Sequence, residues 1–169
     1  MKKILIINSS PRDNGNCAIL CDEFGRGAIT NTDNEVSRID LRSTNMNFYQ
    51  EEQPEDDIAG IAHQIADSNV IVLATPVYFY NMSGQLKTFI DRMMPYFNEF
   101  QDKDFYYILT AAVNRREMES TAEALNGFTD SLPGSNVRYV IYAHNVSNKG
   151  DVLNRQAMQE AFQVASRIK

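Results

Sequence analysis

Two short runs of consecutive apolar residues, at positions 4–7 and 70–74, are the clearest pattern along the chain. Each run is followed by a loop that contains a proline. Such bounded runs are typical of strands that are buried on both faces of a sheet. Three further segments, 36–41, 105–112 and 137–143, are also predicted to be strands.

The segments between these strands carry apolar residues at helical spacing. In the first segment, the residues on one side of the predicted helix are Cys17, Leu20, Cys21, Phe24 and Ala28. Pro54 and the three acidic residues after it predict the start of the second helix, because proline fits a first turn and acids favour the positive end of the helix dipole. Further helices are predicted from Ser83, over 116–132 and over 151–168, and the stretch 42–53 is predicted to be a surface loop.

Strand and helix thus alternate five times without an internal repeat or a linker. This alternation favours an α/β fold, in which a parallel sheet is covered by helices on both faces as a three-layer sandwich. Right-handed crossovers leave few topologies, and five strands fit the flavodoxin-like order 2-1-3-4-5. We therefore predict one flavodoxin-like domain over residues 1–169. Its ligand is expected at the carboxyl ends of the strands, in the loops after strands one, three and four.

Composition narrows the range of partners and locations. The 169 residues are 43% hydrophobic, which is enough for one sizeable core, and their net charge of -6 argues against nucleic acids and anionic membranes. No apolar run approaches the roughly 20 residues of a membrane helix, and the N-terminal run is too short for a signal peptide. Cys17 and Cys21 lie four apart on a predicted helix, a poor geometry for a disulfide. We expect a cytoplasmic protein with reduced thiols, whose partner is a small molecule or a protein.

The loop after the first strand, residues 9–17, combines hydroxyls, amides, a glycine and an arginine directly before a helix. Backbone N–H groups at a helix start, together with the helix dipole, favour a bound phosphate. The predicted phosphate site comprises the side chains of Ser9, Ser10, Arg12, Asn14 and Asn16, with Gly15 allowing close approach of the backbone. The alternative is an ordinary turn in which Asn14 or Asn16 caps the helix. Neither G-x-G-x-x-G nor G-x-x-x-x-G-K-[ST] occurs, which disfavours a dinucleotide-binding Rossmann domain and a P-loop protein.

The loop after the third strand, residues 75–84, places three consecutive aromatic residues between a proline and a helix start. Aromatic side chains at this edge suit a flat ring system, with residues 76–79 as its wall and Asn81 reading a polar edge. The alternative is that these aromatics fill the core or form a subunit contact. Ser83 is predicted to cap the helix, because it lies outside a G-x-S-x-G elbow and has no base partner.

The motifs S-S-P-R with G-N in the first loop, and P-V-Y-F-Y-N-M-S-G-Q-L-K with F-I-D-R in the second, resemble those of the NAD(P)H-dependent FMN reductase and iron-sulfur flavoprotein group. The resemblance extends to the order of elements over nearly the whole chain. It implies FMN as the cofactor and NADPH or NADH as the electron donor. By this resemblance the FMN phosphate is held by Ser9, Arg12, Asn14, Gly15, Asn16 and Cys17. The isoalloxazine ring is lined by Pro76, Val77, Tyr78, Phe79 and Asn81, and Ala112, after the fourth strand, is expected beside the flavin.

Several residues depart from this pattern or stay outside it. Cys17 stands where the group usually has threonine, which removes a hydroxyl but keeps the backbone N–H; both a reactive and a buried structural thiol are consistent with its position. Iron-sulfur flavoproteins carry a cysteine cluster after the second strand, whereas no cysteine occurs in residues 42–53, which excludes a cluster there. The two histidines lie far apart, so no metal site is predicted, and His144 is expected to have a loop or capping role. Asp91 and Arg92 are expected in a salt bridge or a subunit contact.

The sequence therefore predicts an oxidoreductase in which a nicotinamide donor reduces FMN, which then reduces a quinone, nitro compound, flavin or protein. No catalytic side chain is predicted, because the cofactor carries the chemistry. The alternative is a flavodoxin-type electron carrier without its own NAD(P)H oxidation. A response-regulator-like domain is disfavoured, since residues 7–9 lack the paired acids that would hold Mg²⁺. The resemblance also implies a homodimer, in which the aromatic loop and the segment around Phe48 and Tyr49 close the neighbour's site.

Overall fold

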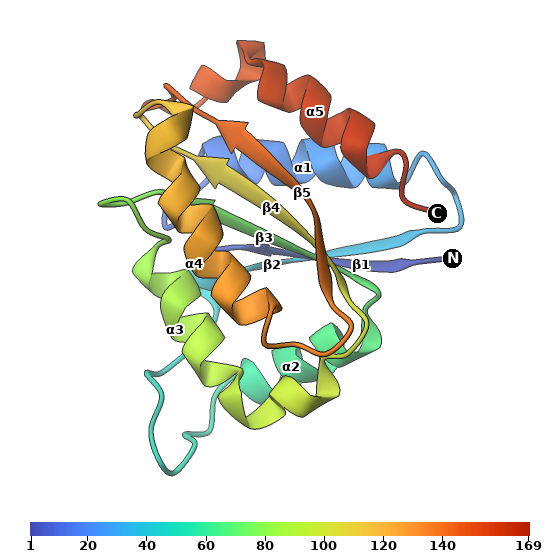
Figure 1. Cartoon of the computed structure of the whole chain (residues 1–169), viewed down its shortest axis with the longest axis vertical. Helices are drawn as coiled ribbons and strands as arrows, with labels where there is room; N and C mark the ends of the chain where they lie inside the picture. The colour runs from blue at the N-terminus through green and yellow to red at the C-terminus, as the bar shows by residue number, and fades with distance from the viewer.

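The computed structural model describes residues 1–169 and contains one five-stranded parallel sheet in the order β2-β1-β3-β4-β5 (Figure 1). The strands are β1 (Lys3–Asn8), β2 (Glu35–Asp40), β3 (Val70–Pro76), β4 (Asp104–Thr110) and β5 (Asn136–Ala143). All four pairings between neighbouring strands are parallel. The predicted flavodoxin-like order is therefore confirmed.

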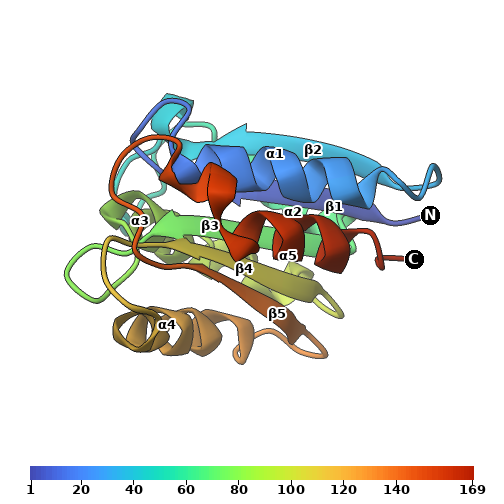
Figure 2. The same ribbon diagram turned by 90° about the horizontal axis from the view of Figure 1, so that it is seen from above.

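Helices cover both faces of the sheet and complete the three layers (Figures 1 and 2). One face packs against α1 (Asn16–Ala28) and α5 (Gln156–Ala165), and the other against α2 (Ile58–Asp67), α3 (Gly84–Arg92) and α4 (Glu119–Thr129). Ile4 and Ile6 of β1 lie in the first core, whereas Leu5 and Ile7 lie in the second. Alternating side chains thus enter opposite layers, which is why the whole run is apolar. None of the helices has the length and apolar character that a membrane span requires.

The boundaries of three predicted helices were wrong. Pro54 precedes the second helix by four residues, because α2 begins at Ile58 and the acidic residues before it are used in other contacts. The predicted helix 116–132 begins as a 3-10 helix, Arg115–Met118, where Asn114 and Glu117 form a capping box, and it ends at Thr129. The last helix is also preceded by a 3-10 turn, Asp151–Asn154, and α5 ends at Ala165.

The irregular segment between β2 and α2 is held against α3 by a buried ion pair. Arg92 donates to both carboxylate oxygens of Asp56, at 2.6 and 3.0 Å, and the two side chains are 2% and 1% exposed. Arg92 also donates to the carbonyl of Asn47 and to the side chain of Gln53. Burial alone raises the pKa of the Asp56 carboxyl, but hydrogen bonds from Arg92 and from backbone N–H groups outweigh it and lower this pKa below its usual value. The predicted salt bridge of Arg92 is confirmed, and it fixes a loop that has no regular structure of its own.

We predict that Arg92→Met lowers the free energy of unfolding by about 3–5 kcal/mol at pH 7, because it leaves the buried Asp56 carboxylate without a partner. Urea denaturation measures this difference. Pairing depresses the folded-state pKa of Asp56, so its contribution is present above the unfolded pKa and is lost as the pH falls through the folded value. The difference between wild type and variant should therefore shrink below about pH 4.

The matched control is Lys87→Met, which breaks the exposed ion pair between Lys87 and Asp91 on the same helix. Exposed pairs contribute less than about 1 kcal/mol. Equal losses in the two variants would contradict the structural role given to the buried pair.

Candidate functional site

The carboxyl ends of the strands lie on the opposite side of the molecule from the two termini (Figure 2). A cleft opens at these strand ends. It lies where β1 and β3 are neighbours but the chain continues from them in different directions, which is the usual ligand position in such sheets. Its volume is about 150 Å³. The lining residues come from four loops and are Ser10, Arg12, Asn16, Cys17, Pro76, Val77, Tyr78, Thr110, Ala111, Ala112, Val146 and Ser147.

The start of α1 faces this cleft without a side-chain cap. Gly15 is the N-cap residue and has no side chain to accept from the first turn. The backbone N–H groups of Asn14, Gly15 and Asn16 donate to no backbone acceptor in the protein. The alternative that Asn14 or Asn16 caps this helix was therefore wrong. Free N–H groups at the positive end of a 13-residue helix form a suitable site for an anion.

The side chain of Asn16 ties the cleft to a distant segment. Its amide nitrogen donates to the carbonyl of Asn148 at 2.9 Å, and its oxygen accepts from the backbone N–H of Gly150 at 3.1 Å. Arg12 makes a similar connection, donating to the carbonyl of Ser147 at 2.7 Å. The loop after β5 is thereby held against the loop after β1, 132 or more residues away in sequence.

The other predicted phosphate ligands lie in different positions around the loop. Ser10 lines the cleft, and its hydroxyl accepts from the N–H of Arg12. Ser9 is fully buried beneath the loop, where its hydroxyl donates to the carbonyl of Ala74 at 2.9 Å. Asn14 is exposed, with φ of 48°. A Cβ added to Gly15 would lie 3.1 Å from the Cβ of Arg12, so this turn favours the smallest residue.

Cys17 lines the inner end of the cleft and is buried. Its sulfur lies 3.1 Å from the hydroxyl oxygen of Thr110. Burial raises the pKa of the Cys17 thiol to about 12, even though the hydrogen bond with Thr110 lowers this pKa. The structure therefore favours a structural thiol at this position over a reactive one.

The aromatic loop divides into an inner wall and an outer tip. Pro76, Val77 and Tyr78 line the cleft as predicted, and the N–H of Val77 donates to the carbonyl of Thr110 at 2.8 Å. Tyr78 and Asn81 exchange backbone hydrogen bonds around a tight turn, in which Phe79 and Tyr80 have φ of 50° and 63°. Two bulky residues with positive φ are uncommon, and they point the tip outward.

Phe79 and Asn81 at the tip, which were predicted to contact the ring, do not line the cleft. Phe79 is 99% exposed. The side-chain oxygen of Asn81 accepts from the N–H of Met82 at 2.8 Å, and Asn81 borders a separate groove between α3 and α4. Contacts of Phe79 and Asn81 with a ligand stay predictions.

The loops after β4 and β5 complete the cleft. Ala112 lines it as predicted, but sequence analysis missed Thr110, Val146 and Ser147. Backbone hydrogen bonds from Val146 to Ala111 and from Asn145 to Val113 hold the two loops together. The topology could have identified Val146 and Ser147, since the loop after β5 leaves the same edge of the sheet as the loops after β1 and β3.

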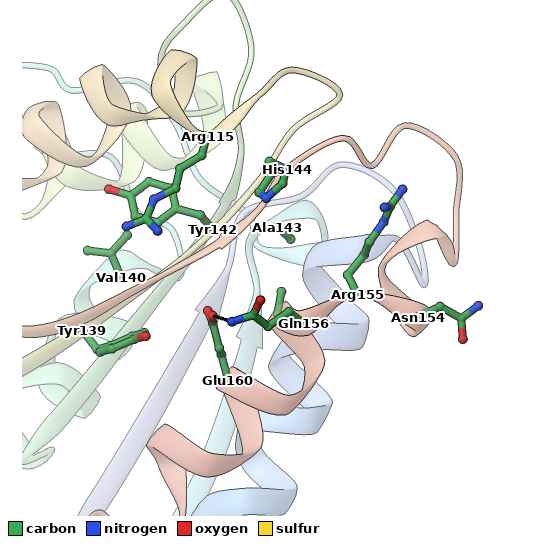
Figure 3. A pocket seen from close by; sticks show the side chains of 11 residues that line it. Arg115, Tyr139, Val140, Tyr142, Ala143, His144, Asn154, Arg155, Gln156 and Glu160 are labelled. Carbon is green, nitrogen blue, oxygen red and sulfur yellow. Dashed lines mark hydrogen bonds between the residues drawn. The ribbon is translucent and has the colours of Figure 1, made fainter.

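A second pocket, of about 670 Å³, lies along the outer edge of β5 (Figure 3). Arg115 stacks over the ring of Tyr142 at 4.7 Å, and His144 contacts the side chain of Asn145. Gln156 and Glu160 of α5 are hydrogen-bonded to each other on the other side (Figure 3). His144 therefore lies in this pocket and not among the residues that line the cleft, in agreement with the loop role expected for it.

The fold and the cleft define a flavodoxin-like protein whose first helix begins, without a side-chain cap, beside the cleft. The sequence profile of the NADPH-dependent FMN reductase family matches residues 2–147. The chain belongs to this family, which confirms the resemblance seen in the two loops.

Individual relatives agree with this assignment. An iron-sulfur flavoprotein of Archaeoglobus fulgidus is 32% identical over 105 residues, which are 57% of this chain and 47% of that protein. A Bacillus subtilis protein named as an NAD(P)H-dependent FMN-containing oxidoreductase is 34% identical over 95 residues, 53% of this chain and 51% of its own. The chain thus spans about half the length of these curated relatives.

The structure of an FMN-dependent NADH-azoreductase from Bacillus anthracis in complex with FMN superimposes with a TM-score of 0.76. The superposition covers 98% of both chains at 15% identity, and it supports the fold alone.

FMN is the cofactor that the family implies, and the residues of the cleft fit it. The uncapped N–H groups at the start of α1 and the guanidinium of Arg12 match a phosphate dianion. The wall from Pro76 to Tyr78 is largely apolar and suits a flat ring. An iron-sulfur cluster does not fit, because these 169 residues contain two cysteines, both buried side chains of α1.

We predict that native protein reacts negligibly with Ellman's reagent at pH 8. With a pKa of about 12, about one Cys17 thiol in ten thousand is ionised at that pH, and the thiolate is the reactive form. The pKa of Cys21 is also raised well above its ordinary value by burial. Unfolding in guanidinium should release both thiols, whereas rapid labelling of folded protein would show that Cys17 is accessible.

Proposed function

We propose that this protein is an NAD(P)H-dependent oxidoreductase that binds FMN in the cleft and passes electrons to a small-molecule acceptor or a redox protein. The observation that supports this proposal is the uncapped start of α1, which borders a cleft with an apolar wall on its other side. FMN, when bound, supplies the redox chemistry by accepting hydride from the nicotinamide and releasing electrons to the acceptor. The protein's own residues bind and orient the reactants.

The phosphate anchor is built from the backbone. The N–H groups around Gly15 and the dipole of α1 favour negative charge, and Arg12 and Ser10 extend the anchor from the same loop. Arg12 is held toward the cleft by its hydrogen bond to Ser147. These groups support binding of the phosphate without any metal ion.

The ring position is supported by the opposite wall. Pro76 and Val77 present apolar surface, and Tyr78, 38% exposed, borders the opening to solvent. An open side is what a nicotinamide and then an acceptor need in order to stack in turn. The residues that line the cleft include no carboxylate and no histidine. Proton transfer therefore depends on solvent or on the acceptor.

The decisive test is anaerobic absorption spectroscopy of the purified, FMN-loaded protein. We expect the flavin band near 450 nm to bleach on addition of NADPH or NADH, with a rate that saturates in donor concentration. Reoxidation by a quinone, a nitroaromatic compound, an azo dye or free flavin then identifies the acceptor class. A protein that binds FMN but does not bleach with either donor would instead be an electron carrier, the alternative function.

We also propose that the protein is a homodimer. A largely apolar groove of about 630 Å³ runs between α3 and α4, and Met94 and Phe97 at its border are 61% and 36% exposed. The exposed Phe79 lies two residues from Asn81, which lines the groove. A projecting ring and a hollow on one face are what a two-fold interface between copies needs. In this arrangement the aromatic tip, and the exposed Phe48 and Tyr49, would approach the neighbour's cleft.

A cytoplasmic location completes the proposal. It is supported by Cys17 and Cys21, which are both free and buried in the structure. Thiols stay reduced in that compartment.

We predict that the protein sediments at twice its chain mass, and that Met94→Glu raises the dimer dissociation constant at least about tenfold by placing a charge in the apolar interface. Analytical ultracentrifugation measures both. Leu153→Glu is the matched control, because Leu153 is 57% exposed on a 3-10 helix that does not border the groove. A monomeric wild type, or equal effects of the two substitutions, would exclude this interface.

A further inference from the structure

Three hydroxyl groups are buried together beneath the cleft. They belong to Ser9 after β1, Thr75 near the end of β3 and Ser83 before α3, and each residue is 0% exposed. A buried hydroxyl is costly unless it is hydrogen-bonded. All three have partners in the structure, and Ser83 bonds directly to Ser9, 74 residues away in sequence.

The hydrogen bonds form a chain that runs from α3 through Ser83 and Ser9 to β3. The backbone N–H of Leu86 donates to the Ser83 hydroxyl at 3.3 Å, which donates to the Ser9 hydroxyl at 2.9 Å. The Ser9 hydroxyl in turn donates to the carbonyl of Ala74 at 2.9 Å. The Ser83 hydroxyl also lies 3.3 Å from the backbone carbonyl of Ser9, so its proton has two acceptors in Ser9, and either hydrogen bond joins Ser83 to the loop after β1.

A second connection joins the same elements from the side of β3. The backbone N–H of Ser83 donates to the hydroxyl of Thr75 at 2.9 Å, and this hydroxyl donates to the carbonyl of Pro76. Ser83 is therefore bonded both to the loop that carries the phosphate anchor and to the strand end that begins the ring wall. Its role as helix cap, predicted from the sequence, accounts only for the bond from Leu86.

We propose that Ser83 is a positioning residue that fixes the distance between the phosphate anchor and the ring wall, so that one FMN molecule engages both at once. The proposal rests on the proposed FMN site. Small apolar side chains could fill the same buried space, but a chain of hydrogen bonds specifies one relative placement of the two loops.

The relative placement of the two loops matters only for a ligand that contacts both the phosphate anchor and the ring wall. The ring and the phosphate of FMN belong to one molecule, so binding at one side makes binding at the other effectively intramolecular. That advantage is lost when the two sides are free to shift. Riboflavin has the ring without the phosphate, and its binding depends on one side only.

The test is titration of the full-length, flavin-free protein with FMN and with riboflavin, followed by flavin fluorescence. Ser83→Ala should raise the dissociation constant of FMN about tenfold, the effect of losing a buried hydrogen bond, and that of riboflavin less than about twofold. Ser9→Ala cuts the same bond from the other side and should have the same selective effect. The double variant should lose less than the sum of the two single variants, because both substitutions remove the same bond between the two hydroxyls.

Thr129→Val is the matched control. Thr129 is also 0% exposed, and its hydroxyl bonds to that of Tyr107 at 2.6 Å, away from the cleft. Its loss should lower the melting temperature without changing the ratio of the FMN and riboflavin dissociation constants. This ratio is the readout that a purely structural role would leave unchanged.

The outcomes separate the two proposals. If wild-type protein binds FMN and both serine variants keep the wild-type ratio, the positioning role is overturned while the proposed function stands. If wild-type protein binds no FMN, both are overturned. Should Ser83→Ala fail to fold, Ser9→Ala decides the question, since it leaves the cap of α3 in place.

Discussion

The structure depends on the position of β1, which lies between β2 and β3 and is buried along almost its whole length. The chain leaves β1 on one face of the sheet through α1 and leaves β3 on the other face through α3 (Figures 1 and 2). The loops that follow β1 and β3 therefore diverge, and side chains cannot close the space between them. The cleft is a consequence of this strand order, and so is its location at the start of α1.

Polar contacts over long sequence distances then position the loops. Arg12 and Asn16 bond to the loop after β5, Val77 bonds to Thr110, and the pair of Asp56 and Arg92 holds the segment after β2. The contacts of Asn16, Thr110 and Arg92 join a loop to a helix or strand that the core already fixes, and the Arg12 contact joins two loops. The loops thus acquire defined positions even though they contribute little to the two hydrophobic clusters.

The sequence predicted the main features of the site because they are local. A glycine directly before a helix and a proline at a strand end restrict the backbone whatever surrounds them. Ser10, Arg12, Asn16, Cys17, Pro76, Val77, Tyr78 and Ala112 were all expected in the site, and all line the cleft. Phe79 and Asn81 belong to the same predicted loop but turn away from it, because the tight turn at residues 78–81 reverses the chain. That reversal depends on backbone hydrogen bonds that the residue types did not reveal.

By itself, the sequence determined the number of strands, their order, the fold class and the family, since apolar periodicity and short motifs act within a few residues of each other. Tertiary structure alone decided that α2 starts at Ile58 and that Val146 and Ser147 line the cleft. It also decided that the Ser9 hydroxyl donates to the carbonyl of Ala74. These features join segments that are far apart along the chain, and their partners are chosen by how the layers pack. The loop after β1 was therefore recognisable in the sequence, whereas its hydrogen bonds to Ser83, before α3, were not.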